Sequence, residues 1–223
     1  MWLDESSWVD VSRGWLDDAD EVYVSLLSGM PWKTSSVFRY DRSIEEPRLG
    51  SYWRPGNPTP HPAIIESHRT LQRRYKVRFD GCGMAYYRNE RDSVAFHRDR
   101  DMQWLDDTVI AILTLGAQRP FLIRPRANRY GHELPDRGAT IDLAPTGGDL
   151  IVMGGAAQAG WEHGVPKLAR RTDGRISLQW RWTSAQSLSL RKAMADGMAS
   201  MAEGSRVPCI SISSMKGELP KAP

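Results

Sequence analysis

The sequence predicts an α+β protein that is mainly β, with helices ahead of a core of short strands. Two observations carry this prediction. Helical periodicity with helix-stop signals is found in the first 75 residues and again near the C-terminus. Between residues 83 and 183 the chain instead divides into short apolar runs separated by Gly, Pro and Asp turn signals. Many short strands at such spacing are typical of an all-β sandwich or barrel-like core.

The first 82 residues are expected to supply N-terminal helices and a lid. One amphipathic helix lies within residues 1–35 and ends at Gly29-Met30-Pro31, because glycine and proline stop a helix. Residues 36–60 are rich in Pro, Gly, Arg and aromatic side chains, which indicates loops or short hairpins with aromatic tips. A second helix is predicted over residues 62–75, since a proline suits the first turn.

Residues 83–183 are expected to form the core. Its candidate strands are Gly83–Tyr87, Ser93–Arg98, Thr108–Leu115, Pro120–Pro125, Thr140–Leu143, Asp149–Met153 and Arg175–Thr183. The sequence predicts an Ala- and Met-rich C-terminal helix over residues 184–204 and a loose tail over residues 205–223. The chain has 223 residues, enough for one domain with a sizeable core, so all three segments are expected to form a single folded domain.

Composition narrows the class of protein. No window approaches the ~18 consecutive apolar residues of a membrane span. The N-terminus lacks the basic start and apolar run of a signal peptide. Cys82 and Cys209 are far apart and form no CxxC motif, which argues against a disulfide framework or a cysteine zinc site. We therefore expect a cytoplasmic monomer that does not enter a membrane.

The charge balance is mildly basic, with a formal net charge of +3. Its basic residues cluster locally. The clusters are Arg69, Arg73, Arg74, Lys76 and Arg78; Arg119, Arg124, Arg126 and Arg129; and Lys167, Arg170 and Arg171. Such clusters can line a nucleic-acid backbone, but they are equally typical of solvated surface, so the sequence leaves both interpretations open.

Three residues have the chemistry of an iron site. His97 and Asp99 form an H-x-D pair, and on extended backbone residues i and i+2 point to the same side. Iron that activates O₂ needs ligands on one face and open positions on the other, which two imidazoles and one carboxylate provide. His163, after the predicted strand 149–153, is the best third ligand. Weaker candidates are His61, His68 and His132. An isolated H-x-D pair is also common at structural or surface positions.

The strand predicted at residues 175–182 alternates cleanly. Its apolar residues face one way, while Arg175, Ser177, Gln179 and Arg181 face the other. Two arginines on a polar interior face are costly unless they meet anions, and a dicarboxylate such as 2-oxoglutarate supplies two. The alternative is an outer strand with its polar face in water.

Together these motifs resemble the AlkB family of Fe(II)/2-oxoglutarate dioxygenases. The family pattern is H-x-D, a distal histidine, and then R-x₅-R, which here reads His97-x-Asp99, His163 and Arg175-x₅-Arg181. The resemblance runs from about Gly83 to Trp182, less than half of the chain. It implies a double-stranded β-helix, or jelly-roll, core with flanking N-terminal helices and an N-terminal lid.

The resemblance also implies residue roles. His97, Asp99 and His163 would bind Fe(II), Arg175 the distal carboxylate of 2-oxoglutarate and Arg181 its keto-acid end. The family's N-x-Y element, which contacts 2-oxoglutarate, aligns with Ala85-Tyr86-Tyr87. Tyr87 matches the motif tyrosine, whereas Ala85 replaces the asparagine and removes a hydrogen bond to the cosubstrate. Asp101 matches the acidic residue that bacterial repair enzymes carry near the target base.

The implied reaction uses O₂ to convert 2-oxoglutarate into succinate and CO₂ while a C–H bond is hydroxylated. On an N-methylated base of the 1-methyladenine or 3-methylcytosine type, the hydroxylated methyl group leaves as formaldehyde. The lid within residues 36–60 would hold DNA or RNA, with Tyr52 or Trp53 stacking on a flipped base. These aromatic side chains are equally expected to cap the core.

Two other functions stay open at this point. The same centre can hydroxylate a small metabolite or a protein side chain. A protein of a different class would bind nucleic acid through an inactive centre, although the intact ligand set and both arginines argue against that interpretation.

Overall fold

The computed structural model describes residues 1–39, 41–99, 102, 107–126 and 139–183. These residues fall within the first of two compact units of the chain, Met1–Thr183. The C-terminal helix and tail predicted for residues 184–223 lie outside the described residues. No helix in the described ranges is long and apolar enough to cross a membrane.

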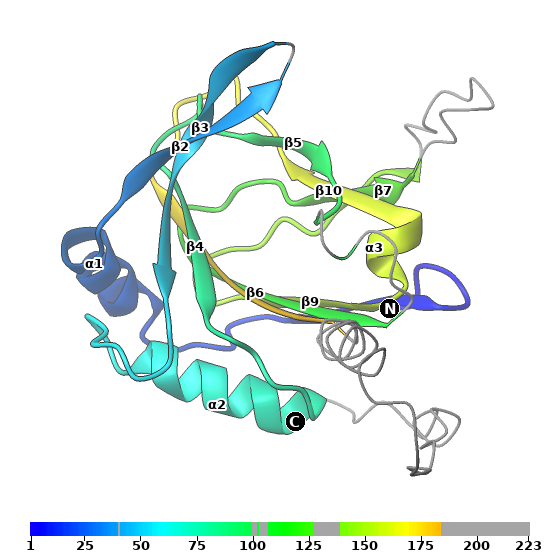
Figure 1. Ribbon diagram of the computed structural model, residues 1–223, viewed down its shortest axis with the longest axis horizontal. Coiled ribbons are helices and arrows are strands. Elements are labelled where there is room, and N and C mark those ends of the chain that lie inside the picture. Colours follow the sequence, from blue (N-terminus) through cyan, green and yellow to red (C-terminus); the bar gives the residue numbers. More distant parts are fainter. Residues whose placement is uncertain (40, 100–101, 103–106, 127–138, 184–223) are drawn as a thin grey trace, which may run out of the picture. The chain divides into compact units, whose positions relative to one another are not determined.

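Two antiparallel sheets form the described unit (Figure 1). The larger sheet has the strand order β1-β9-β6-β11-β4-β3-β2, and the smaller has β5-β10-β7-β8. The strands are β1 (Ser7–Ser12), β2 (Lys33–Arg39), β3 (Arg42–Trp53), β4 (Cys82–Tyr87), β5 (Val94–His97), β6 (Thr108–Gly116), β7 (Leu122–Pro125), β8 (Ile141–Asp142), β9 (Leu150–Gly155), β10 (Trp161–Val165) and β11 (Arg175–Thr183). The helices are α1 (Ala19–Gly29), α2 (Ala63–Tyr75) and α3 (Ala157–Gly160). The mainly β fold with few helices is confirmed.

One hydrophobic core lies between the large sheet and the two longer helices. The helices contribute Val22, Leu26, Ile64 and Leu71, which have no exposed surface. Both helices are amphipathic, so burying one stripe against the sheet leaves their charged sides in water. α2 ends at Lys76, whose left-handed φ of 52° breaks the helical path.

A second core lies between the two sheets. Strand β6 supplies both cores, because its β-branched and aliphatic residues are buried on both faces and alternate between them. Ile110 and Ile112 point into the space between the sheets, where Phe121 and Ile123 meet them. Fully burying one such aliphatic side chain stabilises the fold by about 1.5–3 kcal/mol.

Strand β11 alternates as its sequence predicts. Ile176, Leu178 and Trp180 pack into the helix-side core, so the odd-numbered residues face the space between the sheets. Its first residue is in register with Gly116, which has a φ of +79°. A Cβ there would lie 2.5 Å from the Gly174 oxygen, so only glycine allows the two strands to meet.

The structure differs from the sequence expectations in the N-terminal segment. Residues 1–35 contain the strand β1 as well as the predicted helix, and residues 36–60 lie largely in one long hairpin, β2–β3. β1, β2 and β3 belong to the same sheet as the core strands, since β1 pairs with β9 and β3 pairs with β4. The segment assigned to a lid is therefore built into the sheet.

Candidate metal centre and cosubstrate pocket

The smaller sheet brings the two predicted histidine ligands together. β10 pairs with β5 in a register that places His163 opposite His97, with ring centroids 4.4 Å apart. Asp99 follows β5 by two residues, and its Oδ1 lies 4.0 Å from Nε2 of His97. One ligand atom from each of the three side chains lies within 4.8 Å of the others. The geometry therefore gathers the three residues that the H-x-D pair and the distal histidine predicted.

Both imidazoles are held in the neutral form that a metal needs. Burial, and then the neighbouring His97, lower the pKa of His163 to about 3. Burial also lowers the pKa of His97. Nδ1 of His97 lies 2.9 Å from the Ala95 oxygen, and donation of a proton to that carbonyl leaves the Nε2 lone pair for a metal.

The carboxylate of the cluster is held in its ionised form. Burial alone would raise the pKa of Asp99, but Arg181 and then His163 bring it down to about 2. Arg181 donates from Nε to Oδ2 of Asp99 over 2.9 Å, and Gln158 accepts the Asp99 N–H over 2.9 Å. Two neutral nitrogens and one charged oxygen are the donor set of non-haem Fe(II) sites, so the residues present fit this metal.

The cluster lies in a pocket of about 300 Å³ between the sheets. Its wall from the β2–β3 hairpin includes Ser35, Glu46, Arg48, Leu49, Gly50 and Ser51. Its wall from the core strands and the residue before β7 includes Ala85, Tyr87, Ile110, Ile112, Phe121, Ser177, Gln179 and Arg181. The pocket thus offers an apolar side and a polar side next to the metal ligands, and its two arginines, Arg48 and Arg181, pair with Glu46 and Asp99. Apolar walls with a few polar groups suit a small ligand.

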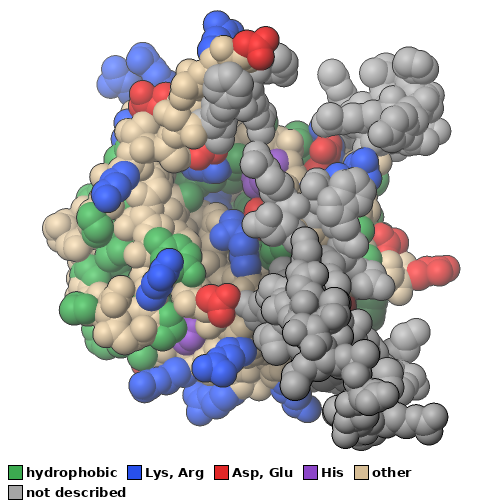
Figure 2. Space-filling view, in the orientation of Figure 1, with side chains coloured by type: hydrophobic (Ala, Val, Ile, Leu, Met, Phe, Trp, Pro, Cys, Tyr) green, Lys and Arg blue, Asp and Glu red, His purple; other side chains and the backbone are tan. Residues whose placement is uncertain are grey.

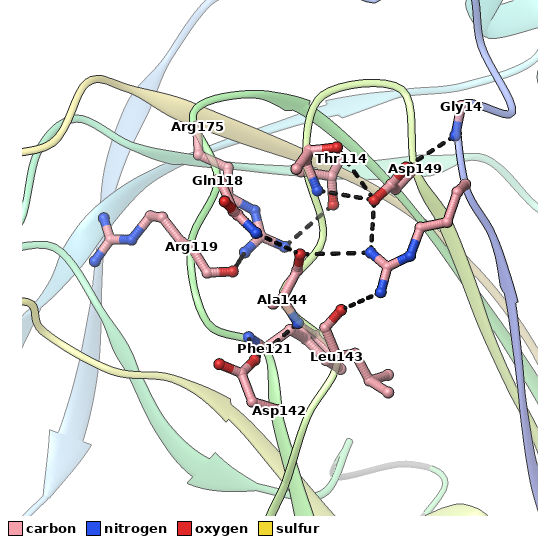
Figure 3. Close-up of polar contacts among 12 residues, drawn as sticks. Gly14, Thr114, Gln118, Arg119, Phe121, Asp142, Leu143, Ala144, Asp149 and Arg175 are labelled. Carbon is pink, nitrogen blue, oxygen red and sulfur yellow. Dashed lines mark hydrogen bonds and ion pairs between the residues drawn. The ribbon is translucent and has the colours of Figure 1, made fainter.

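Arg175 is a buried cation at the far end of β11, one alternation beyond the pocket residue Ser177. Its guanidinium makes two long contacts with described residues, 3.3 Å to Thr114 Oγ1 and 3.5 Å to the Arg119 oxygen (Figure 3). Among the residues that the structure describes, its buried Nε has no hydrogen-bond partner. Burial lowers its pKa to about 10. A buried cation with an unmet donor favours an anion, so Arg175 fits the carboxylate-binding role expected of it.

A second buried arginine, Arg119, was not predicted as a site residue. It has no exposed surface, and its guanidinium donates 2.7 Å bonds to the Asn89 and Asp92 oxygens and a 3.0 Å bond to the Pro166 oxygen. Asp92 leads into β5 and Pro166 follows β10. Arg119 therefore connects the segment before β5 with the segment after β10, and these two strands carry His97 and His163.

Arg119 and Arg175 both lie close to Tyr87. The distances from their guanidinium carbons to the tyrosine ring centroid are 5.4 Å and 6.0 Å. Tyr87 itself is buried and lines the pocket. This arrangement concentrates positive charge beside the residue predicted to contact the cosubstrate.

The Arg175 end of β11 is supported by a polar network (Figure 3). The Thr114 N–H donates to the Asp149 oxygen over 2.9 Å. The Asp149 side chain accepts from Arg13 Nη1 over 2.7 Å and from the Gly14 N–H over 2.9 Å. The network links the turn before β9 to the segment after β1 and keeps the strand ends fixed around Arg175.

The two aromatic residues predicted to bind a base lie in different environments. Tyr52 is 51% exposed, and the Arg54 guanidinium lies 5.8 Å from its ring. Trp53 is buried, stands edge-on to His68 and donates its indole N–H to the Asn57 oxygen. Trp53 therefore belongs to the core, because neighbouring residues of a strand face opposite sides, and only Tyr52 is open to a ligand.

The remaining predicted positions are placed as follows. Ala85, where the family motif has asparagine, lines the pocket on β4 opposite Ser177. His61 precedes α2 by two residues and His68 lies within α2, and neither belongs to the cluster. Asp101 and the weaker histidine candidate His132 lie outside the described residues.

Comparisons with known proteins identify the family. Residues 26–184 match the family described as "2OG-Fe(II) oxygenase superfamily". The chain belongs to this superfamily. Its enzymes use Fe(II), 2-oxoglutarate and O₂, which agrees with the donor set and with the buried cation Arg175. The match includes the three predicted ligands and both arginines of β11.

Curated relatives place the chain among the AlkB-like members. It is 29% identical over 180 residues to the "Alpha-ketoglutarate-dependent dioxygenase alkB homolog 3" of Bos taurus and 30% identical over 178 residues to that of Homo sapiens. These matches cover 74% of this chain and 62% and 61% of the relatives. The "DNA oxidative demethylase ALKBH2" of Arabidopsis thaliana is 26% identical over 189 residues. The chain thus spans less than two thirds of the length of the homolog 3 relatives.

Solved structures show the same fold. A 2OG-Fe(II) oxygenase family oxidoreductase from Burkholderia pseudomallei aligns with a TM-score of 0.51 at 14% identity, covering 80% of this chain and 85% of that one. A prolyl hydroxylase from Trichoplax adhaerens aligns with a TM-score of 0.56 at 14% identity, covering 78% and 83%. The jelly-roll core expected from the AlkB resemblance is confirmed.

Proposed function

We propose that this chain is an Fe(II)/2-oxoglutarate-dependent dioxygenase that demethylates N-alkylated bases in nucleic acid. The products would be the repaired base, formaldehyde, succinate and CO₂. The observation that carries the proposal is the cluster of His97, Asp99 and His163 in a pocket of an AlkB-like chain. The relative named as a DNA oxidative demethylase supports the choice of a nucleic-acid substrate.

Each group has a defined task in this reaction. Bound Fe(II), with 2-oxoglutarate and O₂, supplies the oxidation that places one oxygen atom of O₂ in the C–H bond and the other in succinate. The two histidines and Asp99 would hold the metal from one side. Arg175 would bind and orient a carboxylate of 2-oxoglutarate, and the apolar side of the pocket would exclude water.

The substrate base would enter from the exposed side of the pocket. Tyr52 offers an open aromatic face on which a flipped base can stack. A methyl group on adenine N1 or cytosine N3 blocks pairing and leaves the base cationic, which lowers the cost of flipping. Asp101, two residues after the ligand Asp99, stays our prediction for the group that recognises this positive charge.

Formaldehyde release tests the proposal directly. Protein loaded with Fe(II) and 2-oxoglutarate without O₂ would be exposed to air with oligonucleotides that carry 1-methyladenine or 3-methylcytosine. We expect formaldehyde and succinate in equal amounts, and none from unmethylated oligonucleotides of the same sequence. Turnover on small metabolites or peptides, but on no oligonucleotide, would replace the nucleic-acid substrate by the other hydroxylation chemistry. The cytoplasmic location and monomeric state stay predictions.

A further inference from the structure

A basic surface on and after α2 has no role in the proposed chemistry. We call Arg69, Arg73, Lys76 and Arg78 the α2 basic surface, and all four are exposed. Within the part of the chain that the structure describes, no salt bridge includes any of them. The neighbouring Arg74 of α2 is not part of this surface, because it forms a salt bridge with Asp10. Arg73 donates to Thr70 Oγ1 over 3.4 Å, and no acidic side chain of the described residues neutralises any of the four cations.

The α2 basic surface borders a groove. The groove is lined by Pro62, Ile65, Glu66, Arg69, Gln72, Arg73, Val77 and Arg78. Among these lining residues three are arginines and one, Glu66, is acidic, so the net charge of the lining is positive. The opposite side of α2 packs into the core through Ile64 and Leu71, so the side that borders the groove faces solvent. Lys and Arg side chains gather over α2, along the lower edge of the face in Figure 2.

A chain of contacts connects the metal cluster with α2. Arg181 binds Asp99, and its Nη1 lies 3.3 Å from the position of a Cβ on Gly83. The ring of Tyr52 crosses the same strand and lies within 4.0 Å of that position. Gly83 lines the pocket, so the ring of Tyr52 lies beside the pocket wall.

The path continues from Tyr52 to the α2 basic surface. A Cβ on Gly81 would lie 2.6 Å from the Tyr52 hydroxyl, so the segment after α2 passes directly beneath this ring. Arg78 precedes Gly81 by three residues. On the other side, Trp53 packs against His68 of α2. The end of β3 thus lies on α2, and Arg54 adds a further exposed cation beside the ring.

We propose that the α2 basic surface binds the phosphodiester backbone of the strand that carries the target base. A base that stacks on Tyr52 with its reactive group at the metal leaves the flanking nucleotides over Arg54 and α2. Exposed cations at successive points along a groove suit regularly spaced phosphates, which are contacted without regard to sequence. This inference rests on the proposed function, and it adds a binding surface outside the metal pocket.

The charge-reversal variant R69E/R73E tests the inference. Its matched control is R170E/R171E, since Arg170 and Arg171 are also exposed and the net charge changes equally. Binding of a methylated single-stranded 15-mer would be measured over a range of salt concentrations. The plot of log affinity against log salt becomes less steep by about 0.7 for each phosphate contact that a single strand loses. We expect the slope for R69E/R73E to be less steep by about 1.4 and its affinity to be roughly tenfold lower.

Turnover of a methylated mononucleotide separates this surface from the metal site. A mononucleotide has no flanking nucleotides to lie on α2, so R69E/R73E should demethylate it at the wild-type rate, as should the neutral variant R69Q/R73Q. Equal binding of the 15-mer by wild type and R69E/R73E, or an equal loss in R170E/R171E, would overturn the inference while the proposed function stands. Failure of the wild type to bind or demethylate any oligonucleotide would overturn both.

Discussion

The two ends of β11 hold arginines six residues apart in very different environments. Arg175 has no exposed surface, lies beside Tyr87 and is surrounded by the network that includes Thr114. The Arg181 side chain is 38% exposed and pairs with Asp99. Within the described residues, one strand therefore carries a buried cation without a carboxylate partner and a partly exposed cation with one.

This difference separates two tasks that the R-x₅-R motif does not distinguish. A buried arginine cannot exchange its partner for water, so it holds an anion strongly and in one orientation. An exposed arginine is screened by solvent, and its pairing adds less free energy. We expect Arg175 to dominate the binding of 2-oxoglutarate and Arg181 to position the Asp99 carboxylate.

The largest effect should follow from removing the carboxylate at the Arg181 end. Asp99→Ala should lower demethylation at least 100-fold, because loss of a metal ligand exceeds the 10–100-fold effect typical of residues that orient ligands. Formaldehyde release and Fe(II) titration would be measured together. His61→Ala, which lies outside the cluster, is the control and should remain active. Normal turnover of Asp99→Ala would show that the ligands are misassigned.

The next effect should appear at the Arg175 end. Arg175→Ala should raise the 2-oxoglutarate concentration for half-maximal turnover at least tenfold, since loss of a buried charge-assisted pair costs about 2–5 kcal/mol. Fe(II) affinity should change little, because Arg175 contacts no metal ligand in the described structure. A 2-oxoglutarate titration identical to wild type would remove Arg175 from the cosubstrate site.

Arg181→Ala sharpens the comparison, because it should show the opposite division of effects. We expect a loss of Fe(II) affinity of about tenfold, within the range for residues that orient a metal ligand. The 2-oxoglutarate requirement should rise less than in Arg175→Ala, since the side chain is partly exposed. Arg181→Lys should recover part of the Fe(II) affinity. An equal rise in the 2-oxoglutarate requirement of Arg175→Ala and Arg181→Ala would show that the two arginines do not have separate tasks.

The smallest effect concerns the network behind Arg175. Three donors hold the pKa of Asp149 below its usual value against the effect of burial. A depressed folded-state pKa contributes stability above the unfolded pKa of about 3.9, and this stability is lost as pH falls through the folded pKa. Asp149→Asn should cost about 1–3 kcal/mol of unfolding free energy at pH 7. Denaturant unfolding at pH 7 and at pH 3 should give a smaller difference between variant and wild type at pH 3; a constant difference would contradict this role.

The sequence predicted the cluster of His97, Asp99 and His163 better than it predicted the strands that carry these residues. Period-two geometry was sufficient for His97 and Asp99, because both belong to one local segment. β10 was missed, since Trp161-Glu162-His163-Gly164-Val165 contains a glycine and a charged residue and pairs with strands far away in sequence. The position of His163 therefore followed from its motif, without recognition of its strand.

Two other residues show where local reasoning ends. The sequence analysis placed Arg119 in a basic cluster and did not predict its burial. Its three carbonyl acceptors come from segments 27 to 47 residues away, so no local pattern indicates them. Nothing near it in the sequence indicates burial. Tyr52 and Trp53 differ in exposure only because they alternate on β3, and that strand was interpreted as loops or short hairpins. Once the strand is known, the same period-two rule separates them.

The order of the large sheet leaves two edge strands, β1 and β2. An edge exposes unpaired backbone groups that can recruit another chain and start aggregation. The first half of β2 carries Lys33, Thr34, Ser35 and Ser36, all exposed and polar. At the other edge, Trp2 forms a bridge to Trp8 of β1 and covers part of that strand. We therefore expect both edges of this sheet to discourage strand addition between copies of the chain.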